Sequence, residues 1–221
     1  MTNPIDTLIR NGECALYHDY RLGHAKDLSG NGNDGTLVNS PTWNRNGLAF
    51  DYLGNQAVQV AHDATLNLQT LSAVALVEGG RIKQFSNIPQ LFSKYGSGNT
   101  GYSLSNRDDN GAIALLITSA GTTVYSLSRN LSGFFAQGIS VVDGSVNSPM
   151  YFDGLVVDAS GSAAPSVVNN TEDLFIGNFF TLNRGFGRTI SSFLLFNKAL
   201  SATEHAQVYG QLMKTRQGVL A

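Results

Sequence analysis

Short segments of alternating apolar and polar residues, separated by turn sequences, constrain this chain more than any other feature. Residues 111–119 and 122–128 alternate well and predict two neighbouring strands of a meander. Residues 134–142 and 150–157 predict the next pair. Charged residues make up only 14% of the chain, and there are 24 glycines, which is typical of many short strands joined by turns. We therefore predict an all-β fold.

An early pair of apolar segments lies on either side of Gly54-Asn55. Leu48 and Phe50 precede this dipeptide, and Val58 and Val60 follow it. Because Gly and Asn favour tight turns between alternating segments, we expect the two segments to form a hairpin.

The chain has 221 residues, which suits one large β domain with a sizeable core. No repeat at a fixed period and no linker interrupts it. We expect an irregular N-terminal lead-in over residues 1–13, the domain over residues 14–214, and a C-terminal tail over residues 215–221. The lead-in would either dock on another protein, stay disordered or form an edge strand.

A short helix is predicted near the C-terminus. Ser201 stands three residues before Glu204, the spacing of a capping box. Val208 and Leu212 follow on one apolar face. Gly210 lies inside this helix and weakens it by about 1 kcal/mol relative to Ala.

Two motifs bracket the chain. DLSGNGNDGTL begins at Asp27, and LAFDYLGNQAVQV follows from Leu48. ISSFLLFNKALSATEHAQVYGQL begins at Ile190. Together they resemble the laminin-G-like, concanavalin A-like jelly-roll family, whose early glycine- and asparagine-rich turn precedes a strand and whose last strand leads into a helix. The resemblance implies a two-sheet antiparallel jelly-roll sandwich with a short C-terminal helix. That fold serves lectins, adhesion modules, virion proteins and glucanases, so it gives the function only as a class.

The glutamates argue against hydrolysis. Glucanases of this fold carry two glutamates on one strand as E-x-D-x-x-E, one acting as nucleophile and one as acid. The glutamates of this chain are Glu13, Glu78, Glu172 and Glu204, and no two have that spacing. We therefore predict a protein that is not an enzyme.

The residue patterns also bear on cofactors. Oxygen ligands for calcium could come from Asp27, Asn31, Asn33 and Asp34. The alternative, which we favour, is a structural turn in which these side chains bond the backbone. The histidines do not cluster, and no glycine-rich segment fits a nucleotide-binding loop. We predict no metal and no cofactor.

An aromatic contact surface is expected in two loops. Phe179 and Phe180 are neighbours, and neighbouring side chains of an extended segment point to opposite faces, so at least one ring is exposed. Exposed rings would stack on sugars, whereas the alternative is that these rings fill the core. The predicted contact residues are Tyr95, Tyr102, Phe179, Phe180, Arg184, Phe186 and Arg188.

Charge and cysteine content bear on partners and location. The net charge of −2 and the absence of a basic stripe argue against nucleic-acid binding, and no apolar run is long enough to enter a membrane. Cys14 is the only cysteine and the N-terminus shows no signal peptide, so we expect assembly in a reducing cytoplasm.

Two hypotheses follow. In the first, the protein is a non-catalytic virion decoration or adhesion protein on a phage surface. It would attach to a capsid or tail protein, form a homo-oligomer such as a trimer, and present a surface for glycans or a host. In the second, it is a free-standing, extracellular lectin-like module. A glycoside hydrolase of the same fold is disfavoured by the glutamates.

Overall fold

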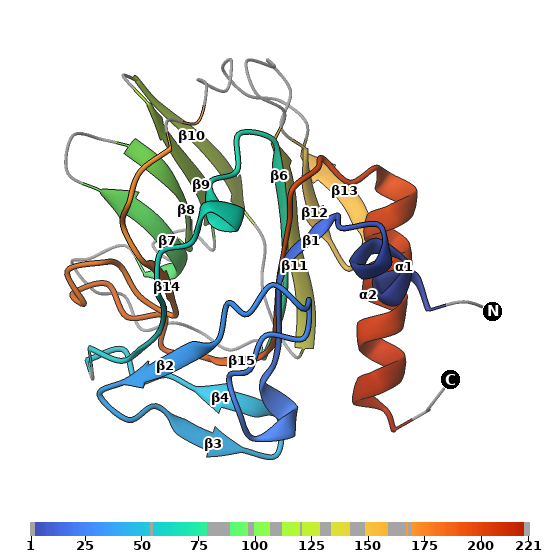
Figure 1. Ribbon diagram of the computed structural model, residues 1–221, viewed down its shortest axis with the longest axis horizontal. Helices are drawn as coiled ribbons and strands as arrows, with labels where there is room; N and C mark the ends of the chain where they lie inside the picture. The colour runs from blue at the N-terminus through green and yellow to red at the C-terminus, as the bar shows by residue number, and fades with distance from the viewer. Residues whose placement is uncertain are drawn as a thin grey trace.

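The described part of the chain forms two antiparallel β-sheets and two α-helices (Figure 1). The computed structural model describes residues 3–53, 55–78, 89–96, 100–106, 112–119, 121–128, 134–141, 149–158, 167 and 169–218. Every strand pair within these residues is antiparallel. The predicted two-sheet antiparallel jelly-roll sandwich with a C-terminal helix is therefore confirmed.

The first sheet, which we call the helix-side sheet, has eight strands among the described residues. Their order is β13 (Leu155–Asp158), β12 (Met150–Phe152), β11 (Phe134–Val141), β6 (Leu71–Glu78), β15 (Thr189–Phe196), β4 (Gly47–Ala49) and β3 (Thr42–Asn44). Strand β1 (Cys14–Asp19) also pairs with β15. The predicted pairing of residues 134–142 with residues 150–157 is confirmed by β11 and β12.

The second sheet has seven strands in the same described ranges. Their order is β10 (Gly121–Ser128), β9 (Ala112–Ser119), β8 (Thr100–Asn106), β7 (Gln90–Gly96), β14 (Leu174–Ile176), β5 (Ala57–Val60) and β2 (Gly35–Val38). The predicted meander is confirmed by β9 and β10, which pair along their full length. Short 3-10 turns lie at Tyr20–Leu22 and Ala64–Leu66.

The predicted hairpin across Gly54-Asn55 is wrong. Strand β4 belongs to the helix-side sheet, whereas β5 pairs with β2 and β14 in the second sheet. Asn55 does adopt a positive φ of 49°, so a turn residue is present, but the chain uses it while crossing between the sheets. Both kinds of connection need the same local residues, and only the pairing partners distinguish them.

The main core lies between the two sheets. Large buried side chains from both sheets meet there, including Phe92, Phe193 and Leu48. A second cluster lies between the helix-side sheet and the helices, and it contains Leu194 and Phe196 from β15. All eight residues of β15 are buried because the core covers one face and the helices the other. This double coverage explains why its sequence lacks polar alternation.

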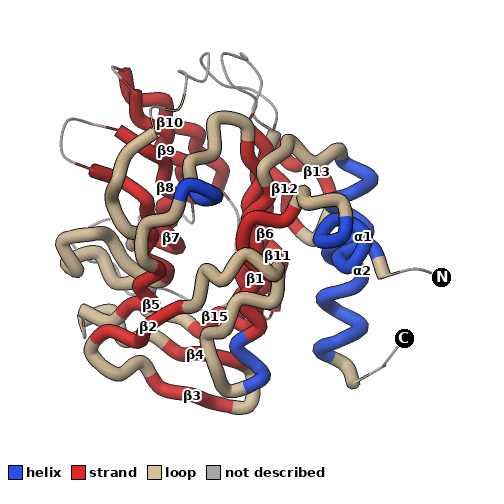
Figure 2. Tube along the Cα trace, in the orientation of Figure 1, coloured by secondary structure: helices blue, strands red, loops and turns tan. Residues whose placement is uncertain are grey.

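Helix α1 (Pro4–Arg10) replaces the predicted irregular lead-in. Asn3 caps it, since its Oδ1 accepts a hydrogen bond from the Ile5 N–H at 3.0 Å. Ile5 and Leu8 are buried in the second cluster. The lead-in is thus part of the folded unit, and α1 lies beside α2 (Figure 2).

Helix α2 (Ala202–Arg216) covers the helix-side sheet. Its predicted capping box is confirmed, because Ser201 and Glu204 exchange side-chain-to-backbone hydrogen bonds. Val208 and Leu212 are fully buried on the predicted apolar face. The helix continues to Arg216, so it includes the first residues of the expected tail at 215–221.

Candidate functional site

Four side chains from two segments of the chain meet near the end of β7. Tyr95 comes from β7 itself. Phe179, Phe180 and Arg184 come from the loop that joins β14 to β15. We call these four residues the aromatic patch. Phe179 is only 7% exposed, whereas Tyr95, Phe180 and Arg184 are half-buried and reach the surface.

The rings of the patch are in mutual contact. The Phe179 centroid lies 4.5 Å from that of Phe180 and 5.2 Å from that of Tyr95. Tyr95 and Phe180 are stacked, with centroids 6.1 Å apart. The guanidinium carbon of Arg184 lies 4.5 Å from the Phe179 centroid, within cation–π range. Phe179 therefore forms the buried base that holds the other three side chains.

Asn178 fixes the loop that carries the patch. Its side chain is fully buried. Its Oδ1 accepts hydrogen bonds from the backbone N–H groups of Phe179 at 2.8 Å and Arg184 at 2.9 Å. Its Nδ2 donates to the Gln56 carbonyl at 3.1 Å. One side chain thus closes the loop on itself and ties it to the segment before β5.

The base of the loop is pinned at Gly177. Its N–H donates to the Leu91 carbonyl at 2.7 Å, and its carbonyl accepts from the Phe186 N–H at 2.9 Å. Gly177 has a φ of +83°, and a Cβ there would lie 2.5 Å from the Phe50 ring. Only glycine fits this conformation and this close approach without strain.

A buried lysine joins β7 to the segment that precedes β14. Lys94 precedes Tyr95 on β7, so its side chain points to the opposite face. Its ammonium donates to the Asn170 Oδ1 and to the Glu172 carbonyl, both at 2.9 Å. Burial lowers the pKa of Lys94 to about 8, although the carboxylates of Asp173 and Glu172 oppose this. Lys94 was not among the predicted site residues. Its position two residues after the core residue Phe92 was the available signal.

Three of the predicted contact residues lie away from the exposed part of the patch. Tyr102 is buried, and its hydroxyl donates to the Leu66 carbonyl at 2.9 Å. It lies directly opposite Lys94 across the β7–β8 pair, so it shares the inward face. Phe186 is fully buried in the main core, and Arg188 is 8% exposed. The expectation that Tyr102, Phe186 and Arg188 contact a ligand at the surface is corrected by this burial.

The glycine-rich turn after β1 is built as the structural alternative predicted. Asp27 Oδ1 accepts hydrogen bonds from the N–H groups of Tyr17 and Ser29. Asp27 Oδ2 accepts from the Ser29 hydroxyl and the Asn33 N–H. Asp34 Oδ1 accepts from the Asp27 N–H. Within the described part of the chain, no group of three or more His, Cys, Asp or Glu side chains could hold a metal ion.

The fold defines a class of two-sheet β-sandwich domains, and solved structures share it. The binding domain of paraclostridial mosquitocidal protein 1 matches with a TM-score of 0.67 and 14% identity over 91% of this chain and 52% of that chain. The binding domain of botulinum neurotoxin DC in complex with SialylT matches with a TM-score of 0.65 and 13% identity, over 91% and 52%. This chain thus spans about half the length of these toxin domains.

A third similar structure is a domain of nearly the same extent. Domain 4 of AbnA, a GH43 extracellular arabinanase from Geobacillus stearothermophilus, was solved in complex with arabinotriose. It matches with a TM-score of 0.66 and 15% identity over 89% of this chain and 98% of that chain. No family model and no curated protein matches the sequence. At these identities the structural likeness establishes the fold. Of the described helices, none is long and apolar enough to cross a membrane.

Proposed function

We propose that this protein is a non-catalytic, lectin-like domain that binds carbohydrate at the aromatic patch. The observation that carries the proposal is the stacked pair Tyr95 and Phe180, which reach the surface above the buried ring of Phe179. Apolar ring faces at a surface offer sugar rings a flat contact, and buried Phe179 keeps them in place. A rigid site loses little conformational entropy on binding.

Polar groups beside the rings suit the hydroxyls of a sugar. Arg184 supplies N–H donors next to Phe179. Thr181 and Asn183 are exposed in the same loop, and their side chains share a hydrogen bond of 2.6 Å. A few such groups around an apolar platform fix the orientation of a bound ligand.

The similar structures support the same ligand class. Domain 4 of AbnA was solved with arabinotriose and the botulinum neurotoxin DC domain with SialylT. We carry over only the class of ligand, because the sequences are 15% and 13% identical to this chain.

One pair of glutamates comes together in space, but its chemistry does not suit hydrolysis. Glu13 and Glu204 each place a carboxylate oxygen beside the Lys198 ammonium, at 3.1 and 2.8 Å. Burial opposes ionisation of Glu204, but hydrogen bonds from Lys198 and Ser201 outweigh it and lower its pKa. A glycosidase acid needs a raised pKa so that it carries a proton at neutral pH. This pair therefore supports the non-catalytic proposal.

The experiment is a glycan array probed with the wild-type protein and with a Tyr95→Ala/Phe180→Ala double variant. We expect wild-type binding to one group of glycans and a loss of about tenfold or more in affinity in the double variant. Leu155→Ala, at a 69% exposed position on β13, is the matched control and should bind like wild type. Equal binding by the double variant would remove the patch from the proposal.

A second part of the proposal concerns where the domain acts and with which proteins it assembles. We place the domain on a virion surface, attached to a capsid or tail protein as a homo-oligomer, with a free extracellular module as the alternative. Cys14 is buried, and burial raises the pKa of its thiol to about 12, so the thiol stays protonated. A chain with this single cysteine forms no intrachain disulfide, which suits assembly in a reducing compartment. Detection of the chain in purified particles by mass spectrometry and cryo-electron microscopy tests this setting. Its absence from particles favours the free module.

A further inference from the structure

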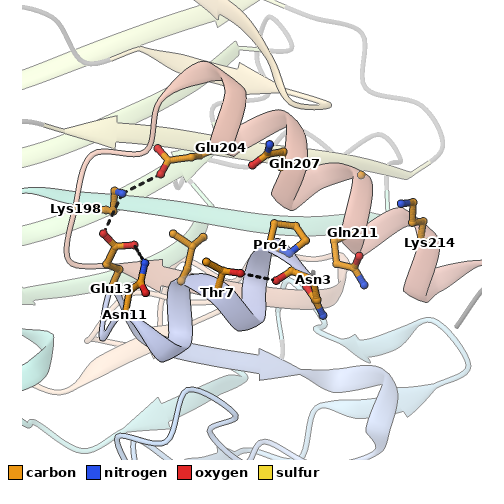
Figure 3. A pocket seen from close by; sticks show the side chains of 12 residues that line it. Asn3, Pro4, Thr7, Asn11, Glu13, Lys198, Glu204, Gln207, Gln211 and Lys214 are labelled. Atoms are coloured by element: carbon orange, nitrogen blue, oxygen red, sulfur yellow. Dashed lines mark hydrogen bonds and ion pairs between the residues drawn. The ribbon is translucent and has the colours of Figure 1, made fainter. Parts of the chain in front are cut away.

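A groove of about 530 Å³ lies between α1 and α2 (Figure 3). Its volume falls in the range of ligand sites. Asn3 and Thr7 line it from the α1 side, and Gln207 and Gln211 line it from α2. The groove lies on the helices, whereas the aromatic patch is carried by β7 and the β14–β15 loop.

The walls of the groove are fixed by the protein itself. Ile5 and Leu8 of α1 are buried in the same cluster as Val208 and Leu212 of α2. Lys198 bonds both Glu13, just after α1, and Glu204, in the first turn of α2. Packing and ion pairs therefore fix the positions of the two helices that form the groove.

Gly210 has no structural reason to be glycine. It lies in the interior of α2, and a Cβ added there would meet no atom within 4 Å. Its φ is not in the positive range that favours glycine. Glycine is nevertheless the worst residue for a helix interior after proline. Since Gly210 lines the groove, the missing side chain leaves α2 open to close approach by a ligand backbone.

The charges of the groove cancel within the protein. Lys198 is shared by Glu13 and Glu204, and these hydrogen bonds raise the pKa of Lys198. Lys214, at the other end, balances the remaining carboxylate in formal charge. A ligand that is itself uncharged fits such a groove best.

The side-chain amides have the spacing of an extended peptide. Gln207 and Gln211 are four residues apart, so they rise about 6 Å along α2. Alternate residues of an extended chain lie about 6.6 Å apart. Each amide can both donate to a carbonyl and accept from an N–H. Among the described residues that line the groove, none has an aromatic ring, so the groove lacks the platform on which a sugar would stack.

We infer that the α1–α2 groove binds an uncharged, extended peptide segment of a partner protein, whose backbone lies against Gly210 and pairs with Gln207 and Gln211. This interaction is separate from carbohydrate binding at the aromatic patch.

A yeast-displayed library of random nonapeptides provides the probe. Selected peptides are titrated against wild type, Gly210→Leu and Gln207→Ala/Gln211→Ala. Gly210→Leu places a side chain in open space inside the groove and raises the helix propensity of α2. The two alanine substitutions also raise helix propensity, so a loss of peptide binding cannot be assigned to unfolding. Thr203→Ala, at an exposed position of α2 outside the groove, is the control.

We expect neutral peptides to be enriched and their affinity to fall about tenfold or more in both groove variants, with Thr203→Ala unchanged. Peptides that bind Gly210→Leu as well as wild type would overturn the inference. A library that yields no enriched peptide would also overturn the inference. An oligosaccharide whose binding is lost in Gly210→Leu would overturn it as well, because the groove would then be a second sugar site.

Discussion

The ring of Tyr95 stacks on the ring of Phe180 with an angle of 21° between their planes, although the two residues belong to different segments. The contact exists because β7 pairs with β14, and the loop after β14 folds back toward the end of β7. The strand pairing therefore sets the geometry of the aromatic patch.

The two neighbouring phenylalanines should respond differently to truncation. Phe179 is buried, so Phe179→Ala should lower the free energy of unfolding by about 3 kcal/mol. Phe180 is half-buried, so Phe180→Ala should cost less than about 1 kcal/mol yet weaken glycan binding. Chemical denaturation and calorimetric titration measure the two effects. A Phe180→Ala variant that unfolds as easily as Phe179→Ala would show that both rings serve the core.

Asn178→Ala should loosen the patch loop. The change removes the acceptor for two backbone N–H groups and the donor to the Gln56 carbonyl, all supplied by a side chain that is itself fully buried. Leaving buried groups unpaired should cost about 2 kcal/mol or more. Thermal unfolding and near-ultraviolet circular dichroism of the aromatic rings report the change. Exposed Asn183→Ala serves as the comparison, and equal melting temperatures for the two variants would contradict this role.

Helix α1 should contribute to stability, contrary to the behaviour of a detachable arm. Leu8 is 6% exposed in the second cluster, so Leu8→Ala should cost about 2–5 kcal/mol. Exposed Arg10→Ala should change the free energy of unfolding by no more than about 0.5 kcal/mol. Urea denaturation measures the free energy of unfolding of both variants and distinguishes the two expected effects. If deletion of residues 1–10 leaves the unfolding midpoint unchanged, α1 does not pack as described.

The capping box of α2 should have a measurable effect. Ser201→Ala removes the acceptor for the Glu204 N–H and should lower the free energy of unfolding by about 1 kcal/mol. Guanidinium denaturation provides the measurement, with Thr203→Ala as a substitution in the same turn without a capping role. If Ser201→Ala leaves the free energy of unfolding unchanged, water satisfies the Glu204 N–H as well as the Ser201 hydroxyl does.

Stability should fall in mild acid through His205. Burial against the helix-side sheet lowers the pKa of His205 from 6.5 to about 3, although Glu204 opposes this. Below pH 6.5 the unfolded chain therefore binds a proton that the folded protein does not. This histidine should reduce the free energy of unfolding by about 1.4 kcal/mol per pH unit as the pH falls from 6.5 toward 3.

The comparison of wild type with His205→Gln isolates that contribution. The ring bonds Ser140 at 2.9 Å and stacks on Tyr151, and Gln retains a polar group without titrating. Denaturation at several pH values should show a shallower loss for the variant. Parallel curves would mean that His205 takes up its proton in the folded state.

The sequence predicted the features that local pattern controls. The alternating sequences of β9 and β10 form neighbouring paired strands, and Ser201 and Glu204 interact within one helical turn. The partner of each strand depends on contacts far along the chain, so the Gly54-Asn55 turn was assigned to the wrong kind of connection. Helix α1 was missed although Asn3 and Pro4 are a start signal, because so short a helix depends on tertiary packing, here in the second cluster.

The candidate site was predictable in part for a similar reason. The adjacent rings of Phe179 and Phe180 required that one be exposed, and the structure buries Phe179 and leaves Phe180 at the surface. Tyr102 was misplaced because the inward face of β8 is set by its register with β7. Asn178 looked like an ordinary loop residue, since its bonds to Gln56 and Arg184 depend on the folded loop.

Carbohydrate binding at the aromatic patch is tested most directly by nuclear magnetic resonance. Isotope-labelled protein is titrated with the tightest glycan from the array, and backbone amide shifts are followed. If the glycan binds at the aromatic patch, the largest shifts will occur at Tyr95 and residues 178–184, and the amides of the α1–α2 groove will not shift. Shifts confined to other surfaces, or no glycan that binds, would contradict binding at this patch.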